Sequence, residues 1–216
     1  QYSIVNSYTS TTIFTLVSVS SSGVTICSQL QTGSMSIIVA PLPFVSLSSD
    51  VSVCPDEQTT ITFTGTPNAT VTYNINAGTN QTIDLDSSGI GLLTNSYSST
   101  TVISLVSIKT QGSPGCIAAL TGEVKITIFP LPFATISANS NVCAESNAII
   151  KIKGTPNATV VYTINGGSNL TILLNGIGEA EISSILTVNS TYALVSVTSS
   201  TSSCNSLLTD SVTINI

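Results

Sequence analysis

The side chains best suited to covalent chemistry in this 216-residue chain are its five cysteines. Cys54 and Cys143 each follow a valine, whereas Cys27, Cys116 and Cys204 each follow a long segment rich in Val, Ser and Thr. Regularly placed Cys in a chain with few charges favours disulfide bonds and an oxidising, extracellular compartment. Because the chain has no His and no clustered Cys, we expect no metal site.

Acidic residues are the next candidates, but they are scattered along the chain. Asp84 and Asp86 resemble a carboxylate pair for acid–base catalysis, yet the residues 89 positions later are Leu173 and Asn175. No His is present as a general base, and no Ser lies in a Gly-x-Ser-x-Gly sequence. We therefore expect no catalytic residues and no enzymatic activity.

A cation site is the other role that acidic residues could have. Asp56 and Glu57 are adjacent, but only Glu145 is kept 89 positions later, which is too few ligands for a specific calcium site. We expect solvated surface acids, no cofactor and no bound metal.

Asparagine offers a site for covalent modification. Asn-x-Ser/Thr sequences are acceptors for N-glycosylation where the host has the machinery, and they fall here in expected turns or strand edges. The candidate acceptors are Asn68, Asn80, Asn157, Asn169 and Asn189.

A repeat of about 89 residues positions all of these residues. Pro41–Phe44 recurs as Pro130–Phe133 (130 − 41 = 89), and Gly65–Val71 recurs as Gly154–Val160 (154 − 65 = 89). The sequence therefore predicts the C-terminal strands of a truncated repeat at 1–40 and complete repeats at 41–129 and 130–216. Because a repeat without its first strands cannot close its own core, we expect the natural chain to extend N-terminally.

Each complete repeat has the pattern of a β-sandwich. Apolar and polar residues alternate, as in Val71, Tyr73 and Ile75, and no segment has a helical period. Tight turns are expected at 76–78 and 165–167, where Asn and Gly tolerate positive φ. Seven short strands in one repeat predict an all-β fold of tandem immunoglobulin-like sandwiches in a linear rod, with a closed barrel as the structural alternative. The expected strands of the first complete repeat are 44–49, 59–64, 70–76, 80–85, 90–94, 102–108 and 123–129.

The core is expected to rely on tyrosine, because the chain has no Trp. Tyr73 and Tyr162 are placed on the third strand of their repeats as aromatic bulk. Tyr192, with Phe14 and Ile103 as counterparts, begins the sixth strand and is interpreted as a core residue.

Proline-rich joints connect the repeats. Pro41 and Pro43 begin one repeat, Pro130 and Pro132 begin the next, and no Gly separates the last strand from the first. Proline restricts φ and favours extended backbone, so we expect semi-rigid joints. The prolines could also prevent edge pairing between sheets.

The repeat leaves two disulfide patterns open. Within a repeat, Cys54 would pair with Cys116 and Cys143 with Cys204, and the partner of Cys27 would lie outside the chain. In an immunoglobulin-like sandwich, however, these two loop positions lie at opposite ends, further apart than the roughly 4.4–6.8 Å between Cα atoms that a disulfide requires. The alternative is a cross-domain bridge from Cys54 to Cys204.

Composition restricts the partners. Charged residues make up 6% of the chain and the formal net charge is −6, which argues against nucleic acid as a partner. No apolar run reaches the roughly 18 residues of a membrane-spanning helix, so we expect no membrane span in this segment. Expected partners are neighbouring repeats of the same chain, identical chains in a filament that pair through poorly protected edge strands, and surface glycans or a substratum.

Several motifs together resemble a known family. The Pro130–Pro132 joint, the segments Ser140–Cys143 and Gly154–Tyr162, and the Leu194–Thr198 strand resemble the Ig-like repeats of giant Bacteroidota surface adhesins, of the flavobacterial gliding-motility type. The resemblance covers essentially the whole chain. It implies export through the type IX secretion system and attachment at the bacterial cell surface. Asp210–Val212 also resembles the Asp-Ser/Thr-aliphatic site of Bacteroidota O-glycosylation, which implies Ser211 as an acceptor.

These observations predict a structural and adhesive repeat segment of a long extracellular bacterial protein or filament. Its repeats would act as a semi-rigid stalk for adhesion or gliding motility. The alternative is a carbohydrate-binding or accessory module array of a secreted enzyme. Sugar platforms generally need exposed aromatic residues, and aromatic residues make up only 5% of this chain.

Overall fold

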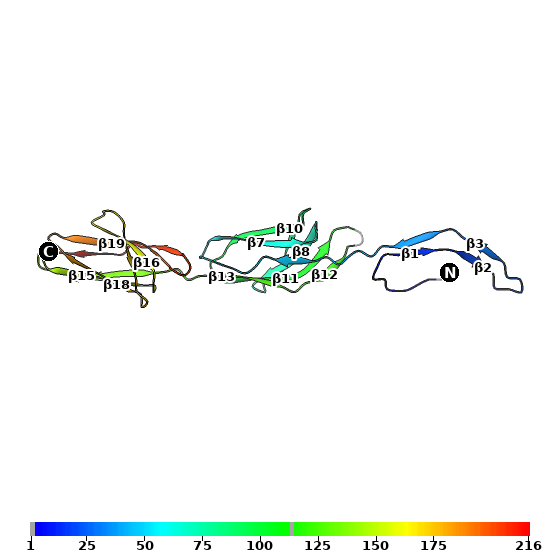
Figure 1. The fold of residues 1–216 in the computed structure, drawn as a ribbon, viewed down its shortest axis with the longest axis horizontal. Coiled ribbons are helices and arrows are strands. Elements are labelled where there is room, and N and C mark those ends of the chain that lie inside the picture. The colour runs from blue at the N-terminus through cyan, green and yellow to red at the C-terminus, as the bar shows by residue number, and fades with distance from the viewer. Residues whose placement is uncertain (1–2, 113–114) are drawn as a thin grey trace. The chain divides into compact units, whose positions relative to one another are not determined.

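The structure is a computed structural model that describes residues 3–112 and 115–216, and in these residues every regular element is a β-strand (Figure 1). The predicted all-β fold is confirmed. Residues 1 and 2 of the predicted truncated repeat lie outside the described residues. Within the two described ranges no helix is long and apolar enough to span a membrane.

The chain separates into two compact units whose bounds differ from those of the sequence repeats. One unit comprises residues 1–48, 62–92 and 104–123, and the other comprises 49–61, 93–103 and 124–216. The second unit therefore includes all of the repeat 130–216 together with three segments of the repeat before it. The division into repeats at 41, 130 and 216 stays a prediction from the sequence.

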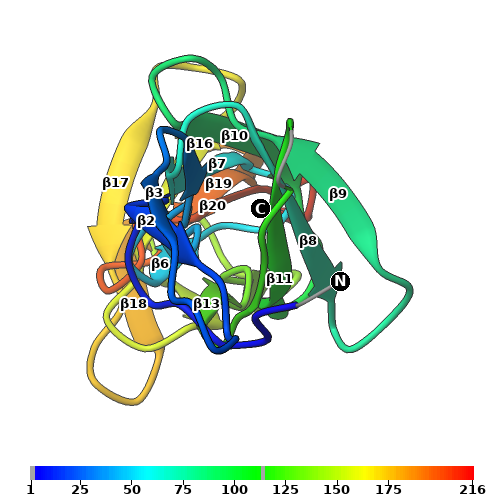
Figure 2. The same ribbon diagram turned by 90° about the vertical axis from the view of Figure 1, so that its right-hand side faces the viewer.

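The C-terminal repeat forms two sheets. One has the order β14-β15-β18, and the other has the order β17-β16-β19-β20 with β21 also paired to β19. In Figure 1, β15 and β18 lie in one layer and β16 and β19 in the other, and in Figure 2 the edge strand β17 lies at the periphery. The strands are β14 (Ala134–Ala138), β15 (Asn147–Gly154), β16 (Thr159–Ile164), β17 (Leu170–Leu173), β18 (Glu179–Ile185), β19 (Ser190–Thr198), β20 (Asn205–Leu207) and β21 (Ser211–Ile214).

Both sheets contribute to one hydrophobic core, so the repeat is a β-sandwich. Ile150 and Ile152 come from β15, Val160 from β16, and Tyr192 from β19, and all four are buried. Alternate residues on each strand point inward because side chains alternate across a pleated sheet. The expectation that Tyr162 and Tyr192 are core residues is confirmed, since they are 8% and 1% exposed.

The preceding repeat has the same arrangement of strands. One sheet has the order β10-β7-β5, and the other has the order β6-β13-β11-β8-β9 with β12 paired to β11. Tyr73 is buried on β8, as predicted. The strands are β5 (Val45–Leu47), β6 (Val51–Val53), β7 (Gln58–Gly65), β8 (Ala69–Ile75), β9 (Gln81–Asp84), β10 (Ile90–Ser96), β11 (Thr101–Thr110), β12 (Ile117–Ala119) and β13 (Glu123–Ile128).

Two of these strands were not expected from the sequence. The short β6 pairs in parallel with β13, with Val51 opposite Ile126 and Val53 opposite Ile128. The short β12 pairs with the end of β11 and forms a hairpin that holds Cys116 in its connection. Both additions lie beside the cysteines.

The N-terminal segment forms two antiparallel strand pairs, β1–β4 and β2–β3. These strands lie 89 residues before strands of the next repeat. β1 and β2 correspond to the two halves of β11, β3 corresponds to β12, and β4 corresponds to β13. The strands are β1 (Thr12–Thr15), β2 (Ser18–Ser20), β3 (Ser28–Leu30) and β4 (Ser34–Ile37).

The predicted tight turns are present in both complete repeats. Asn76 and Ala77 have φ of 51° and 54°, and Asn165 and Gly166 have φ of 52° and 69°. In each turn the glycine N–H donates to the carbonyl of the residue three positions earlier, from Gly78 to Ile75 at 2.9 Å and from Gly167 to Ile164 at 2.9 Å. Paired positive φ angles match the right-handed twist of the flanking strands.

Candidate functional site

The start of each complete repeat is held by its Gly-Thr-Pro-Asn motif. In the last repeat the Phe133 N–H donates to Thr155 Oγ1 at 3.0 Å, and the Thr155 N–H donates to the Phe133 carbonyl at 2.9 Å. The same reciprocal pair joins Phe44 and Thr66, at 3.1 and 2.9 Å. The threonine therefore anchors the residue that directly follows each Pro-Leu-Pro joint.

Glycine at the first position of the motif allows this close approach. A Cβ on Gly154 would lie 2.1 Å from the Phe133 carbonyl oxygen, and a Cβ on Gly65 would lie 2.2 Å from that of Phe44. Asn157 then takes φ of 58° after Pro156, and the Ala158 N–H donates to the Thr155 carbonyl at 3.2 Å. This is the geometry of a type II turn, in which Pro and a positive φ occupy the two central positions.

The joint prolines differ in exposure. The second proline of each joint, Pro43 or Pro132, is buried, whereas the first, Pro41 or Pro130, is exposed. The Pro132 carbonyl also accepts a hydrogen bond from Ser206 Oγ at 2.6 Å. Each joint is thus tied to the repeat that it begins.

A disulfide bond connects the two complete repeats. Cys54 and Cys204 are joined with 5.6 Å between their Cα atoms and 150 residues between them in sequence. Both belong to the compact unit that contains residues 49–61 and 124–216. The structure therefore contains the cross-domain pairing, one of the two alternatives that the sequence left open.

The pairing within repeats is wrong in this structure. Cys143 follows Val142, whose N–H donates to the Asn215 carbonyl beside the Ser190 end of β19. Cys204 lies at the other end of β19, because its carbonyl accepts from the Ser199 N–H at 2.9 Å. The nine residues of β19 separate the two cysteines by about 26 Å, far beyond disulfide reach.

The same reason applies to the other pair expected within a repeat. Cys54 and Cys116 occupy the corresponding positions of the first complete repeat (143 − 54 = 89, 204 − 116 = 88). Cys116 is a free thiol, as are Cys27 and Cys143.

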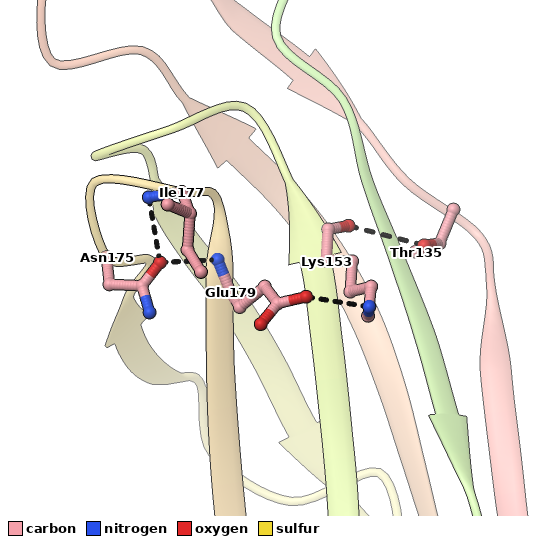
Figure 3. Close-up of polar contacts among 5 residues, drawn as sticks. All are labelled: Thr135, Lys153, Asn175, Ile177 and Glu179. Carbon is pink, nitrogen blue, oxygen red and sulfur yellow. Dashed lines mark hydrogen bonds and ion pairs between the residues drawn. The ribbon is translucent and has the colours of Figure 1, made fainter.

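Asp86, a member of the carboxylate pair considered from the sequence, shapes a loop. Asp86 Oδ1 accepts from the Ser88 and Ile90 N–H groups at 2.8 and 2.9 Å. In the next repeat Asn175 Oδ1 accepts from the Ile177 and Glu179 N–H groups at 3.0 and 2.9 Å (Figure 3). The carboxylate of Asp86 and the amide of Asn175 both provide an Oδ1 acceptor. The two repeats therefore share the hydrogen bonds at this position and not the acidic group.

The remaining acidic candidates also have local partners. Asp84 Oδ1 accepts from Thr70 Oγ1 at 2.6 Å, on the neighbouring strand. Glu57 Oε2 accepts from the Cys54 N–H at 3.1 Å, and Asp56 takes φ of 60° in the same turn. No group of three or more His, Cys, Asp or Glu side chains suited to a metal ion occurs in the described part of the chain.

A charged patch that the sequence reasoning missed lies on β15 and β18. Lys153 Nζ is 2.7 Å from Glu179 Oε1 (Figure 3), with the two side chains 62% and 44% exposed. Lys151 lies directly opposite Glu181 in the strand register. The hydrogen bond from Lys153, its positive charge and that of Lys151 lower the pKa of the Glu179 carboxyl below its usual value. The patch surrounds a hollow of about 280 Å³. The two lysines lie two residues apart on β15 and the two glutamates lie two residues apart on β18, and this spacing is the signal that could have identified the patch.

Burial raises the pKa of the two core tyrosines on the third strand. Desolvation disfavours the charged phenolate of Tyr73, and in Tyr162 the nearby Tyr192 adds to the same effect. Tyr73 also donates to Gln81 Oε1 at 3.1 Å. Burial therefore favours the neutral hydroxyl in both tyrosines.

The candidate glycosylation residues are all exposed: Asn68, Asn80, Asn157, Asn169, Asn189 and Ser211. Asn68 and Asn157 lie in the type II turns, and Asn80 and Asn169 directly precede β9 and β17. Asn189 Oδ1 is engaged as an acceptor from the Ile216 N–H at 2.8 Å. Their modification stays a prediction.

An apolar hollow of about 540 Å³ lies on the N-terminal segment, along β1 and β4. Its lining includes Phe14, Leu16, Met35 and Ile37. Addition of 89 gives the positions Ile103, Leu105, Val124 and Ile126, which are buried in the next repeat. The hollow is therefore the face of these strands that corresponds to the sandwich core.

Comparison with known proteins adds little to this geometry. No family model and no curated protein matches the sequence. Solved structures that are similar include the fibronectin(III)-like modules of Clostridium thermocellum CbhA, at 14% sequence identity and a TM-score of 0.34, over 80% of this chain and 94% of that chain.

Proposed function

We propose that this chain is a structural and adhesive repeat segment of a long extracellular bacterial surface protein or filament, and that it acts as a semi-rigid stalk. The observation that carries the proposal is the Cys54–Cys204 disulfide, which covalently joins two successive repeats. A covalent bond across a joint restricts bending at that joint. A spacer that transmits force or projects a tip requires such a restriction.

The anchoring of each joint supports the same function. Phe44 and Phe133 are fixed by paired hydrogen bonds to Thr66 and Thr155 directly after the prolines. The positions that are kept in both complete repeats thus shape the backbone, the core and the joints. Adhesion, gliding motility, export by the type IX system and location at the bacterial cell surface follow from the family resemblance and form part of this proposal.

Small-angle X-ray scattering can test the stalk. We would compare the oxidised protein with the Cys54→Ser/Cys204→Ser variant, both with Cys27→Ser and Cys143→Ser so that copies do not crosslink. We expect the variant to show a broader distribution of interatomic distances, because the joint bends more freely. Cys116→Ser in the same background is the matched control and should scatter like the bridged protein.

Identical scattering with and without the bridge would contradict the stalk. A pull-down on insoluble polysaccharide distinguishes the alternative function, since saturable binding by the 216-residue chain would instead favour a carbohydrate-binding or accessory module. Images of the native parent protein should show a beaded thread with one bead per repeat.

A further inference from the structure

Two asparagines of this chain directly precede a glycine, and both lie in the last repeat. They are Asn165, before Gly166, and Asn175, before Gly176. The backbone nitrogen of the residue after an asparagine can attack the side-chain amide, and glycine allows the closest approach because it has no Cβ. The attack releases ammonia and converts the amide into a carboxyl group. The two sites differ in how the structure holds the side chain.

At Asn175 the amide oxygen is held by donors of its own loop. Oδ1 accepts from the Ile177 N–H at 3.0 Å and from the Glu179 N–H at 2.9 Å, so the side chain folds back over the residues that follow it (Figure 3). The amide nitrogen Nδ2 points away from both donors in Figure 3, and Asn175 is exposed. Nδ2 can therefore leave into solvent as ammonia.

The two donors to Asn175 Oδ1 favour attack on this amide. When a nucleophile adds to Cγ, the electron pair of the carbonyl moves onto Oδ1, which becomes negatively charged. Backbone N–H groups that are already directed at this oxygen stabilise the charge without rearrangement, as in an oxyanion hole. The loop thus lowers the barrier to the first step.

Asn165 is held across the sheet instead. Its Oδ1 accepts one bond, from the Thr191 N–H at 2.7 Å, and its own N–H donates to the Thr191 carbonyl at 2.8 Å. The amide is therefore tied to β19 and not to the residues that follow it. The N–H groups of Gly166 and Gly176 are equally free of backbone partners in the described part of the chain, so the glycines themselves do not distinguish the two sites.

The preceding repeat carries the product of this reaction at the corresponding position. Asp86 corresponds to Asn175 (175 − 86 = 89), and its carboxylate accepts from the Ser88 and Ile90 N–H groups at 2.8 and 2.9 Å. The glycines three residues later take φ of 77° and 79°, so the two loops share their backbone. This loop accommodates a carboxylate in place of the amide.

We propose that Asn175 is a modification site at which the chain converts its own amide to a carboxyl group by deamidation. The Gly176 nitrogen loses its proton to base in the solvent and attacks Cγ, and ammonia leaves with Nδ2 as a five-membered succinimide closes. Water then opens the ring. Cleavage of the Cγ–N bond gives aspartate, and cleavage of the backbone C–N bond gives isoaspartate. The sum is an amide and water converted to a carboxylic acid and ammonia, with no oxidation or reduction.

The modification changes the charge of the hollow on β15 and β18. Asn175 lines this hollow together with two lysines and two glutamates, namely Lys151, Lys153, Glu179 and Glu181. A carboxylate at residue 175 adds a third acid, so the balanced patch becomes net negative. The charge of this surface therefore depends on the age of the protein.

The test is incubation of the folded, disulfide-bonded protein in mildly alkaline buffer, followed by peptide mapping with mass spectrometry at successive times. We expect the Asn175 peptide to exchange NH2 for OH about tenfold faster than the Asn165 peptide, less than the roughly 10²–10³-fold effect of one enzyme oxyanion donor because this loop is exposed. After reduction and unfolding in urea, the two peptides should convert at similar rates, since both contain Asn-Gly.

Two variants test the chemistry and the loop separately. Gly176→Ala should slow conversion several-fold, because a Cβ hinders the attacking nitrogen. A Cβ at this site meets only Asn157 Oδ1, at 4.0 Å, so the variant keeps its fold. Asp86→Asn/Ser87→Gly places the Asn-Gly pair in the equivalent loop of the preceding repeat, where residue 86 should convert at a rate similar to that of Asn175.

The inference is overturned if Asn175 stays intact, or if it converts no faster than Asn165 in the folded protein. Asn175→Asp reproduces the aspartate product and should keep the circular dichroism spectrum and the unfolding temperature of the parent chain. A loss of folded structure in this variant would contradict the equivalence of the two loops. The inference is independent of the proposed stalk, because Asn175 takes no part in the Cys54–Cys204 bridge.

Discussion

At the scale of single residues, left-handed backbone marks the same positions in both complete repeats. Asp56 and Glu145, and likewise Asn68 and Asn157, take φ between 55° and 63°. Asn and Asp tolerate this conformation better than most residues because their short polar side chains bond locally. Backbone conformation at these turns is therefore conserved even where the side chain changes from Asp to Glu.

Ala77 carries a Cβ at a turn position whose positive φ favours glycine. It takes φ of 54°, whereas the equivalent Gly166 takes φ of 69° with no Cβ to accommodate. We predict that Ala77→Gly raises the free energy of unfolding by about 0.5–1 kcal/mol, because the strain of a Cβ at positive φ outweighs the extra entropy of the unfolded glycine. Chemical denaturation followed by circular dichroism measures the change.

Gly166→Ala is the matched control and should lower the free energy of unfolding by a similar amount. The cause would be backbone strain at positive φ alone, since no heavy atom lies within 4 Å of a Cβ at this site. A stabilising effect of Gly166→Ala, or a destabilising effect of Ala77→Gly, would show that the turns are not equivalent.

At the scale of elements, β15 and β18 carry charges on their solvent face where β7 and β10 do not. Lys151, Lys153, Glu179 and Glu181 correspond to Thr62, Thr64, Ile90 and Leu92 in the preceding repeat. Opposite charges on directly paired strands attract each other, so this patch favours the observed pairing of β15 with β18. The patch is not part of the architecture that the two repeats share.

The charged patch predicts a pH dependence at Glu179. Its pKa is lowered in the folded state, so the attraction is present above the unfolded pKa and is lost as the pH falls through the folded pKa. We predict that Lys153→Gln raises the pKa of Glu179 toward its usual value, and that Lys151→Gln raises it by less. NMR titration of the Glu179 side-chain carboxyl carbon measures both.

Lys109→Gln is the control and should leave the Glu179 titration unchanged, since Lys109 lies on β11 and is not among the groups that shift this carboxyl. An equal effect of all three substitutions would mean that net charge, and not the cross-strand contact, sets the pKa.

The sequence predicted the long strands and missed two short ones, β6 and β12, for a physical reason. Alternation over six or more residues identified β7, β8, β11 and β13, because such a pattern is long enough to be recognised. The strand β6 has three residues and pairs with β13, more than 70 positions away, so nothing local reveals it. The loop bond at Asp86 was also missed, because Asn175 replaces the acid while it keeps the acceptor oxygen.

At the scale of the whole molecule, the sequence supplied both disulfide patterns but could not choose between them. Spacing gives the positions of Cys54 and Cys204 within their repeats, and only the folded chain places them 5.6 Å apart at their Cα atoms. The length of β19 excludes the pairing of Cys143 with Cys204, and strand length is a property of the fold. The choice of disulfide partner at the joint therefore depends on tertiary structure more than on any sequence motif.

This bridge should couple the unfolding of the two complete repeats. Its closed loop spans 150 residues, for which the chain-entropy model gives about 5 kcal/mol of stabilisation through the unfolded state. We predict that Cys54→Ser/Cys204→Ser lowers the free energy of unfolding by about 2–5 kcal/mol and separates one thermal transition into two, because each repeat then unfolds without constraint from the other. Calorimetry measures both effects, and Cys116→Ser should change neither. A single transition at an unchanged temperature in the double variant would show that the Pro-Leu-Pro joint and its Phe133–Thr155 hydrogen bonds couple the repeats without the covalent bond.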